Sequence, residues 1–336
     1  MGLQMKRGSI MGKDLASKNL LNCADVFADV GNVNLFHGEE LLSADSLEPQ
    51  PTELTYKDNH GTMRGHQLDT RMKATEQEMD IAIFCMENQS EVSQIMPVRD
   101  MGYQYSNYNE QIQQIRKKNE NEGIYYTVSG IGKNQKLIPV ISIILYYGTE
   151  EWDGPEKLSD MFSIPEKWKE KLSPWITEHP IHVVNLSRQD EATREKYKSD
   201  FRHIANYLAC KGNPEKLQKY IDDNHVIRHP EEYLDMMAAF NGDKRFLQIK
   251  ENLLRQIQEG KEEITMYTIV DKFENIGVRK GLVQGFEQGM EQGMEQGISQ
   301  GKREIILNML NDGQKPELIS KYTNESLDYI HQLRED

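Results

Sequence analysis

Two apolar runs separated by an amphipathic segment form the clearest pattern in the chain. Residues 79–86 (MDIAIFCM) and 137–147 (LIPVISIILYY) are apolar almost throughout, which predicts two strands that are buried on both faces. Between them, apolar side chains recur three and four positions apart over residues 96–118, which predicts a helix. A buried strand, a helix and a second buried strand favour a βαβ crossover with parallel pairing.

A second helix is predicted nearer the N-terminus, over residues 22–36, where valines at four- and three-residue spacing form an apolar stripe. Asp25 and Asp29 share another face of this helix. Residues 1–19 show no periodicity, and we expect them to form a flexible tail. The predicted fold class is α/β, with a core over residues 20–186 in which a mixed sheet is flanked by helices.

The C-terminal part is predicted to be helical, because apolar stripes at helical spacing follow one another over residues 187–280. A tract with glycine at every fourth position then covers residues 281–302. This tract is either a flexible Gly/Gln linker or a helix that packs closely against a partner helix and makes a homo-oligomer. Residues 303–336 are expected to form short helices broken at Gly313 and near Asn324, with Asn324 as an N-cap.

Composition narrows the class of protein further. The longest apolar stretch, residues 138–147, is roughly half the length that a membrane-spanning helix needs, and no secretory signal is visible. The three cysteines are odd in number and far apart, which argues against disulfides and favours the cytoplasm. The formal net charge of −14 is unusual for a nucleic-acid-binding protein unless a metal ion bridges carboxylates to phosphate.

Candidate chemistry lies at the end of the first buried strand, where Glu87, Asn88 and Gln89 follow the apolar residues. Side chains alternate along a strand, so Glu87 and Gln89 are expected on one face. Together with Asp69 upstream, Glu87 could hold a hard divalent cation, with a backbone carbonyl and waters completing the shell. The pattern alone occurs often by chance, and the competing interpretation is that Glu87 simply ends the strand in solvent.

The residues around this strand end carry a resemblance to a known family. The stretch from Met86 to Tyr108, MENQSEVSQIMPVRDMGYQYSNY, resembles the recombination-promoting nuclease family, also described as YhgA-like putative transposases, within the PD-(D/E)XK nuclease superfamily. Further matches are FADVGNVNLFHGEELL near the N-terminus, LDTR around Asp69, LIPVISIILYYGTEEWDGP, and FENIGVRKG with the glycine tract that follows it. The resemblance covers most of residues 21–302.

The resemblance implies a restriction-endonuclease-like core with a metal site. Asp69 would be the metal-binding aspartate of the superfamily and Glu87 its second acidic residue, and the two would hold Mg²⁺ or another hard divalent cation. Gln89 stands where many members of the superfamily have a lysine. Glutamine carries no charge, so Gln89 could orient the attacking water or a phosphate oxygen but could not act as a base.

Two further residues receive roles from the resemblance. Asp29 is the candidate for the helix-borne acidic residue of the superfamily and would support the outer shell of the metal. The other acids open to that role are Asp25, Glu39 and Glu40. Arg99, in the first turn of the helix after the motif strand, could grip a phosphate through two hydrogen bonds or could make a structural pair with Glu91 or Asp100.

These features predict a cytoplasmic, metal-dependent endonuclease that cleaves DNA, is associated with recombination or mobile DNA, and does not interact with membranes. The alternative is a catalytically degenerate nuclease fold that binds DNA or proteins and self-associates through residues 281–302. The acidic balance of the chain and the uncharged Gln89 favour this alternative. Retained affinity for DNA without metal-dependent cutting would distinguish it from the enzyme.

Overall fold

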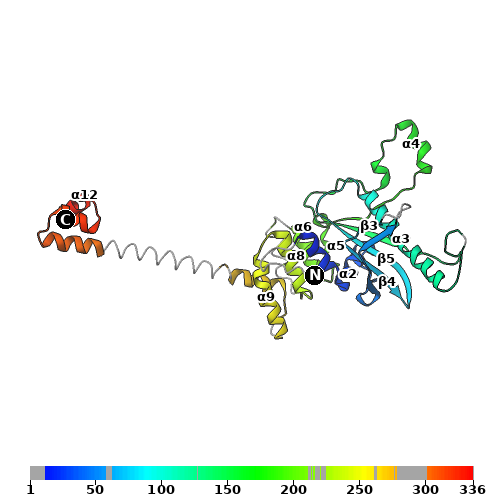
Figure 1. Cartoon of the computed structure of the whole chain (residues 1–336), viewed down its shortest axis with the longest axis horizontal. Coiled ribbons are helices and arrows are strands. Elements are labelled where there is room, and N and C mark those ends of the chain that lie inside the picture. The colour runs from blue at the N-terminus through cyan, green and yellow to red at the C-terminus, as the bar shows by residue number, and fades with distance from the viewer. Residues whose placement is uncertain are drawn as a thin grey trace. The chain divides into compact units, whose positions relative to one another are not determined.

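A computed structural model of the chain contains two compact units, residues 1–270 and 271–336, and each has its own core (Figure 1). The described residues are 12–57, 63–126, 128–210, 213, 215, 220, 225–260, 263–275, 277 and 301–335. Among the helices in these ranges, none is both long enough and apolar enough to cross a membrane.

A mixed five-stranded sheet lies at the centre of the first unit, in the order β1-β4-β5-β6-β7. Its strands are β1 (Leu47–Pro49), β4 (Thr70–Glu76), β5 (Met79–Gln89), β6 (Val140–Tyr146) and β7 (Val183–Asn185). The first three strands pair antiparallel, whereas β5, β6 and β7 pair parallel. A separate hairpin consists of β2 (Glu53–Lys57) and β3 (Met63–Gln67). The predicted α/β class with a mixed sheet is confirmed.

The predicted βαβ crossover is also confirmed, because helix α3 (Met96–Asn121) connects β5 to the parallel strand β6. Strand β5 is longer than predicted and reaches Gln89. Its residues from Ala82 to Glu87 are buried, but the first three residues of the strand are exposed. Burial on both faces is therefore a property of the centre of β5, where neighbouring strands and helices cover it.

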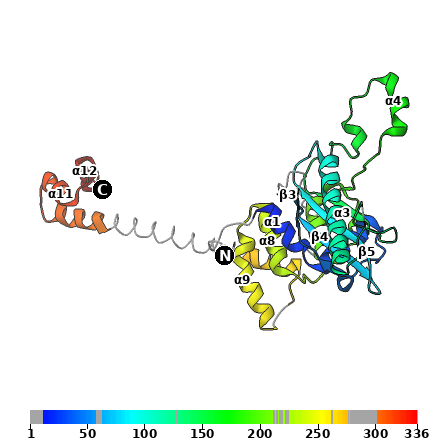
Figure 2. The ribbon, with the colours of Figure 1, turned by 45° about the vertical axis from the view of Figure 1, so that its right-hand side comes forward.

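Helices cover both faces of the sheet (Figures 1 and 2). On one face, Ile83 and Cys85 of β5 belong to the same buried cluster as Tyr103 of α3. On the other face, Phe84 of β5 meets Phe36 edge to face, with the two ring centroids 6.4 Å apart. Alternate residues of β5 thus point toward α3 or toward the N-terminal helices.

The first described helix, α1 (Lys13–Leu21), contradicts the prediction of a flexible tail for residues 13–19, whereas residues 1–11 of the predicted tail lie outside the described residues. Its fully buried apolar side chains are those of Ala16, Leu20 and Leu21. The helix packs against α8 (Pro230–Asn241), so it is an integral part of the first unit. With only nine residues, α1 contains too few apolar positions for a helical repeat to stand out in the sequence.

The other helices largely follow the predicted pattern. Further helices described in the first unit are α2 (Ala24–Leu35), α4 (Glu166–Leu172), α5 (Glu191–Arg194), α6 (Phe201–Cys210) and α9 (Arg245–Gln258), and another helix covers residues 266–275 at the boundary of the two units. Short 3₁₀ helices cover Ala44–Ser46, Leu158–Met161, Ser173–Trp175 and Leu186–Arg188. Helix α2 confirms the helix predicted over residues 22–36. Helix α4 lies at the tip of an excursion between β6 and β7 that stands away from the sheet (Figure 1).

The second unit contains a helix over residues 301–311, followed by α11 (Pro316–Thr323) and α12 (Leu327–Glu335). The predicted breaks are confirmed, because Gly313 and Asn324 both adopt positive φ angles, of 77° and 58°. Asn324 ends α11 in the left-handed conformation, so the prediction that it caps the next helix is wrong. The glycine tract from residue 281 to residue 300, and with it the predicted self-association, lies outside the described residues.

Candidate active site

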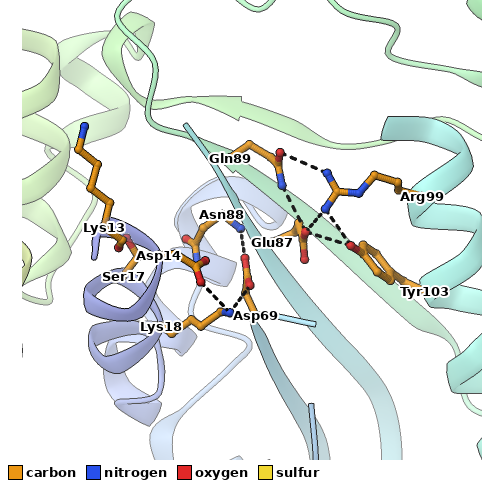
Figure 3. Close-up of polar contacts among 10 residues, drawn as sticks. All are labelled: Lys13, Asp14, Ser17, Lys18, Asp69, Glu87, Asn88, Gln89, Arg99 and Tyr103. Atoms are coloured by element: carbon orange, nitrogen blue, oxygen red, sulfur yellow. Dashed lines mark hydrogen bonds and ion pairs between the residues drawn. The ribbon is translucent and has the colours of Figure 1, made fainter. Parts of the chain in front are cut away.

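The neighbouring ends of β4 and β5 bring the two predicted acids to one edge of the sheet. The antiparallel register pairs Thr70 with Met86, so Asp69, just before β4, lies beside Glu87 of β5. Oδ2 of Asp69 accepts a hydrogen bond from the backbone N–H of Asn88 at 2.6 Å. This bond ties the aspartate directly to the strand that carries the glutamate (Figure 3).

On the α3 side of β5, Glu87 is the centre of a hydrogen-bond network. Its Oε1 accepts hydrogen bonds from Nη2 of Arg99 at 2.7 Å and from the hydroxyl of Tyr103 at 3.1 Å. Nε2 of Gln89 donates to the same oxygen at 3.2 Å. Arg99 and Tyr103 are one turn apart on α3, so a single helix presents both donors to the carboxylate (Figure 3).

The second oxygen of the Glu87 carboxylate, Oε2, is buried and has no hydrogen-bond partner among the described residues. Burial of the carboxylate and the nearby negative charge of Asp69 raise the pKa of Glu87 to about 7, although Arg99 and Tyr103 act in the opposite direction. Burial and Glu87 in turn raise the pKa of Tyr103 to about 12, which keeps its hydroxyl protonated. Glu87 is therefore a buried acid whose charge is incompletely compensated.

On the opposite side of β5, helix α1 contributes two residues that the sequence analysis missed. Nζ of Lys18 lies 2.8 Å from Oδ1 of Asp69 and 3.0 Å from Oδ2 of Asp14. Burial would lower the pKa of Lys18, but the hydrogen bonds with Asp69 and Asp14 outweigh it, and the pKa is raised. The spacing of Asp14 and Lys18, four positions apart, is the one sequence signal that could have indicated this pair on a helix.

Asn88 lies between these two sets of contacts, and its side chain is on the α1 side of β5 (Figure 3). Neither Nδ2 nor Oδ1 of this side chain has a hydrogen-bond partner within the described part of the chain, and both atoms are buried. Buried polar atoms in proteins are nearly always hydrogen-bonded. Glu87 and Asn88 thus each have buried polar atoms without a partner among the described residues, one on the α3 side of β5 and the other on the α1 side.

The donor atoms at the strand end fit a hard divalent cation. A carboxylate has about four lone-pair sites, and the contacts with Lys18 and Asn88 involve one site on each oxygen of Asp69. Oε2 of Glu87 adds a second hard oxygen. A cation held by Asp69 and Glu87 would also relieve the repulsion between the two acids, which the pKa of Glu87 reflects.

The structure does not bring Asp29 into this network. Oδ2 of Asp29 accepts hydrogen bonds from the backbone N–H of Lys198 at 2.9 Å, the N–H of Ser199 at 2.8 Å and the hydroxyl of Ser199 at 2.6 Å. Burial raises its pKa in spite of these bonds. The proposed support of the metal shell is thus replaced by a structural role, in which Asp29 fixes the turn that precedes α6.

Two of the alternatives to Asp29 pair elsewhere, because Asp25 pairs with His229 and Glu40 pairs with Lys198, and the third, Glu39, is exposed. Within the described residues, the predicted structural pair of Arg99 with Glu91 or Asp100 is not formed. Arg99 pairs with Glu87, whereas Asp100 binds His179 with an Nε2 to Oδ2 distance of 2.7 Å. Of the five predicted site residues, the structure joins Asp69, Glu87, Gln89 and Arg99.

Comparison with known proteins gives one match. A family model described as "Putative transposase, YhgA-like" matches residues 39–236 of the chain. No curated protein and no solved structure matches. The matched segment contains Asp69, Glu87, Gln89 and Arg99, but it begins after α1 and so leaves Lys18 outside.

Proposed function

The chain belongs to the family of YhgA-like putative transposases, and we propose that it is a metal-dependent endonuclease that hydrolyses phosphodiester bonds in DNA. In this proposal the mixed sheet and its flanking helices form a restriction-endonuclease-like core, and the activity serves recombination or mobile DNA. The observation that carries the proposal is the convergence of Asp69 and Glu87 at one strand end, where Oε2 of Glu87 is buried and has no hydrogen-bond partner in the part of the chain that the structure describes.

Asp69 and Glu87 would hold Mg²⁺ or a similar ion. A bound ion of this kind polarises the phosphate, stabilises the leaving oxygen and lowers the pKa of a bound water. In the hydrolysis, the water oxygen bonds to phosphorus, the bridging P–O bond breaks, and a proton from the water ends on the leaving oxygen. Gln89 donates a hydrogen bond to Glu87, and in this proposal its uncharged amide would orient the water rather than deprotonate it.

Arg99 would bind the phosphate of the substrate. Its guanidinium is partly exposed, with 33% of the side chain accessible, while it holds the 6% accessible Glu87. It also lies 3.4 Å, Nη1 to Oε1, from Gln89, so one fork contacts both motif residues. When Glu87 binds a cation, Arg99 can release this carboxylate and bind a phosphate instead. The planar guanidinium suits phosphate because it can donate two parallel hydrogen bonds.

A plasmid assay tests the proposal. Supercoiled DNA incubated with the wild-type protein and Mg²⁺ should become nicked or linear, and chelation should stop the reaction. Asp69→Ala and Glu87→Ala should abolish cutting. Asp80→Asn is a matched control, because Asp80 lies at the opposite end of the same strand and is half exposed. Equal cutting by the wild type and both alanine variants would remove Asp69 and Glu87 from the mechanism.

The second candidate function is that of a catalytically degenerate module that binds DNA or proteins and self-associates through residues 281–302. One observation favours it: each acid is already paired with a basic side chain, Asp69 with Lys18 and Glu87 with Arg99. A degenerate module would retain its affinity for DNA without cutting in Mg²⁺. Light scattering on the full chain and on a chain truncated at Gly281 tests the self-association. If both proteins contain the same number of subunits, the self-association through residues 281–302 is refuted.

A further inference from the structure

Helix α1 flanks the candidate active site on the side of β5 opposite α3 (Figure 3). The geometry points to Lys18 as a further catalytic residue of this site, whose ammonium group contacts a phosphate oxygen of DNA, with Asp14 as its positioning residue. This inference rests on the proposed nuclease function and deepens it, because it assigns the substrate phosphate to Lys18, which lies beside Asp69 at the end of β5 (Figure 3).

Lys18 is held in place before any substrate binds. Ala16, Leu20 and Leu21 anchor α1 in the core, and the Lys18 side chain is only 20% exposed. Its ammonium carries three N–H donors. Asp69, at 2.8 Å, and Asp14, at 3.0 Å, engage two of them. The third donor is the one that we assign to the phosphate.

The charges around the strand end indicate why an ammonium belongs here. Gln89 carries no charge, and Arg99 stands on the α3 side, where it pairs with Glu87. On the α1 side the cation next to Asp69 is Lys18, and Asn88 adds a buried amide Nδ2 that has no partner among the described residues. An ammonium and an amide N–H at one strand end form a donor pair that suits an anionic oxygen. In a chain with a net charge of −14, a phosphate needs such local cations.

Three variants of α1 test the catalytic role in single-turnover cleavage at saturating Mg²⁺. Lys18→Met should lower the rate constant by about 10²- to 10³-fold, as the loss of one electrostatic contact in a transition state does. Lys18→Arg retains the charge and should recover most of this loss. Lys13→Met is the matched control, because Lys13 lies on the same helix but points away from the strand end, and it should cut like the wild type (Figure 3). The Mg²⁺ concentration for half-maximal cutting should be the same in all four proteins.

A second measurement does not depend on activity. Affinity for a DNA duplex is measured at several salt concentrations in the presence of EDTA, so that no cutting occurs. A side chain that neutralises one phosphate contributes about 0.9 to the slope of log K against log [salt]. Lys18→Met should reduce the slope by about this amount, whereas Lys13→Met should leave it unchanged.

The positioning role of Asp14 is tested by measuring the cleavage rate constant and the DNA concentration for half-saturation separately. Asp14→Asn should lower the rate constant about tenfold with little change in the DNA concentration for half-saturation, and Asp14→Glu should restore part of the rate. A merely structural role would instead appear as an equal loss in both variants together with a lower melting temperature.

The outcomes separate this inference from the proposed function. If the wild type does not cut, the proposed function fails, and the role of Lys18 fails with it. If the wild type cuts and Lys18→Met cuts equally well with an unchanged salt slope, only the inference is overturned. If Lys18→Met loses activity and Lys18→Arg does not recover it, the side chain serves packing rather than charge, and the inference is again overturned.

Discussion

Glu87 and Asp29 are two buried carboxylates of one chain that differ in the partners they have. Their residues are 5% and 9% exposed, and burial raises the pKa of both. Asp29 binds two backbone N–H groups and one hydroxyl, all from the Lys198–Ser199 turn. Among the described residues, the partners of the Glu87 carboxylate are the side chains of Arg99, Tyr103 and Gln89, and one of its oxygens has no hydrogen-bond partner there.

This difference distinguishes an acid that stabilises the fold from the acid that we propose as a metal ligand. Backbone donors cannot move away without unfolding the turn, so the carboxylate of Asp29 is committed to the structure. Side-chain donors such as Arg99 can turn to another anion, and an unpaired oxygen can accept a new ligand. Burial or a raised pKa alone would not have distinguished the two residues.

The largest expected effect is the loss of cutting in Glu87→Gln. The substitution keeps the shape of the side chain and removes the charge that would bind the cation. We expect cleavage of supercoiled plasmid to fall by about 10³-fold, or roughly 4 kcal/mol in transition-state energy. Circular dichroism should show an unchanged fold. If Glu87→Gln cuts as fast as the wild type, Glu87 is a structural acid like Asp29.

Asp29→Ala should lower the stability of the protein and have little effect on cleavage, which is the opposite of what we expect for Glu87→Gln. It leaves the buried N–H and hydroxyl of Ser199 and the partly buried N–H of Lys198 without this acceptor, so we expect the free energy of unfolding to fall by about 2–4 kcal/mol. Urea denaturation measures this loss, and the cleavage rate of the folded fraction should stay within a few-fold of the wild type. Asp25→Ala, in which a half-exposed pair with His229 is removed, serves as the control and should cost less than about 1 kcal/mol. Loss of cutting without loss of stability would contradict the assignment.

The pH dependence of stability sharpens the comparison. The pKa of Glu87 is about 7 in the folded protein, against 4.5 as its ordinary value. Between these values the folded state binds the proton more tightly than the unfolded state, so stability falls as pH rises. From pH 5 to pH 8 in EDTA, the wild type should lose about 2–3 kcal/mol relative to Glu87→Gln. Parallel urea-denaturation profiles for the two proteins would show that Glu87 is not an uncompensated buried acid.

Tyr103→Phe gives the smallest expected effect. It removes one of the three donors to Oε1 of Glu87 and leaves Arg99 and Gln89 in place. The free energy of unfolding should fall by about 1 kcal/mol, and the cleavage rate should change by less than about tenfold. A rate loss as large as that of Glu87→Gln would assign Tyr103 a direct part in the chemistry.

The sequence predicted the parts of the fold that long apolar runs determine. Strand β5, helix α3 and strand β6 lie close to their predicted ranges, because burial on both faces leaves an uninterrupted apolar signal. The prediction that Asp69 lies near Glu87 is confirmed, because Asp69 hydrogen-bonds the N–H of Asn88 at the end of β5. Helix α1 escaped prediction because one face of a nine-residue helix offers few apolar positions. Asp29 was misplaced because a sequence does not reveal which distant backbone groups an acid will bind.

The packing of α1 against α8 determines when the candidate active site is completed during synthesis of the chain. The ribosome releases α1 first, but the helix that supports it emerges only after the whole sheet has been made. Until then Lys18 has no fixed position beside Asp69. A nascent or prematurely terminated polypeptide that ends before Pro230 would expose the sheet without α1 in place. If the chain cuts DNA, the fold itself therefore delays that activity until α8 has been made.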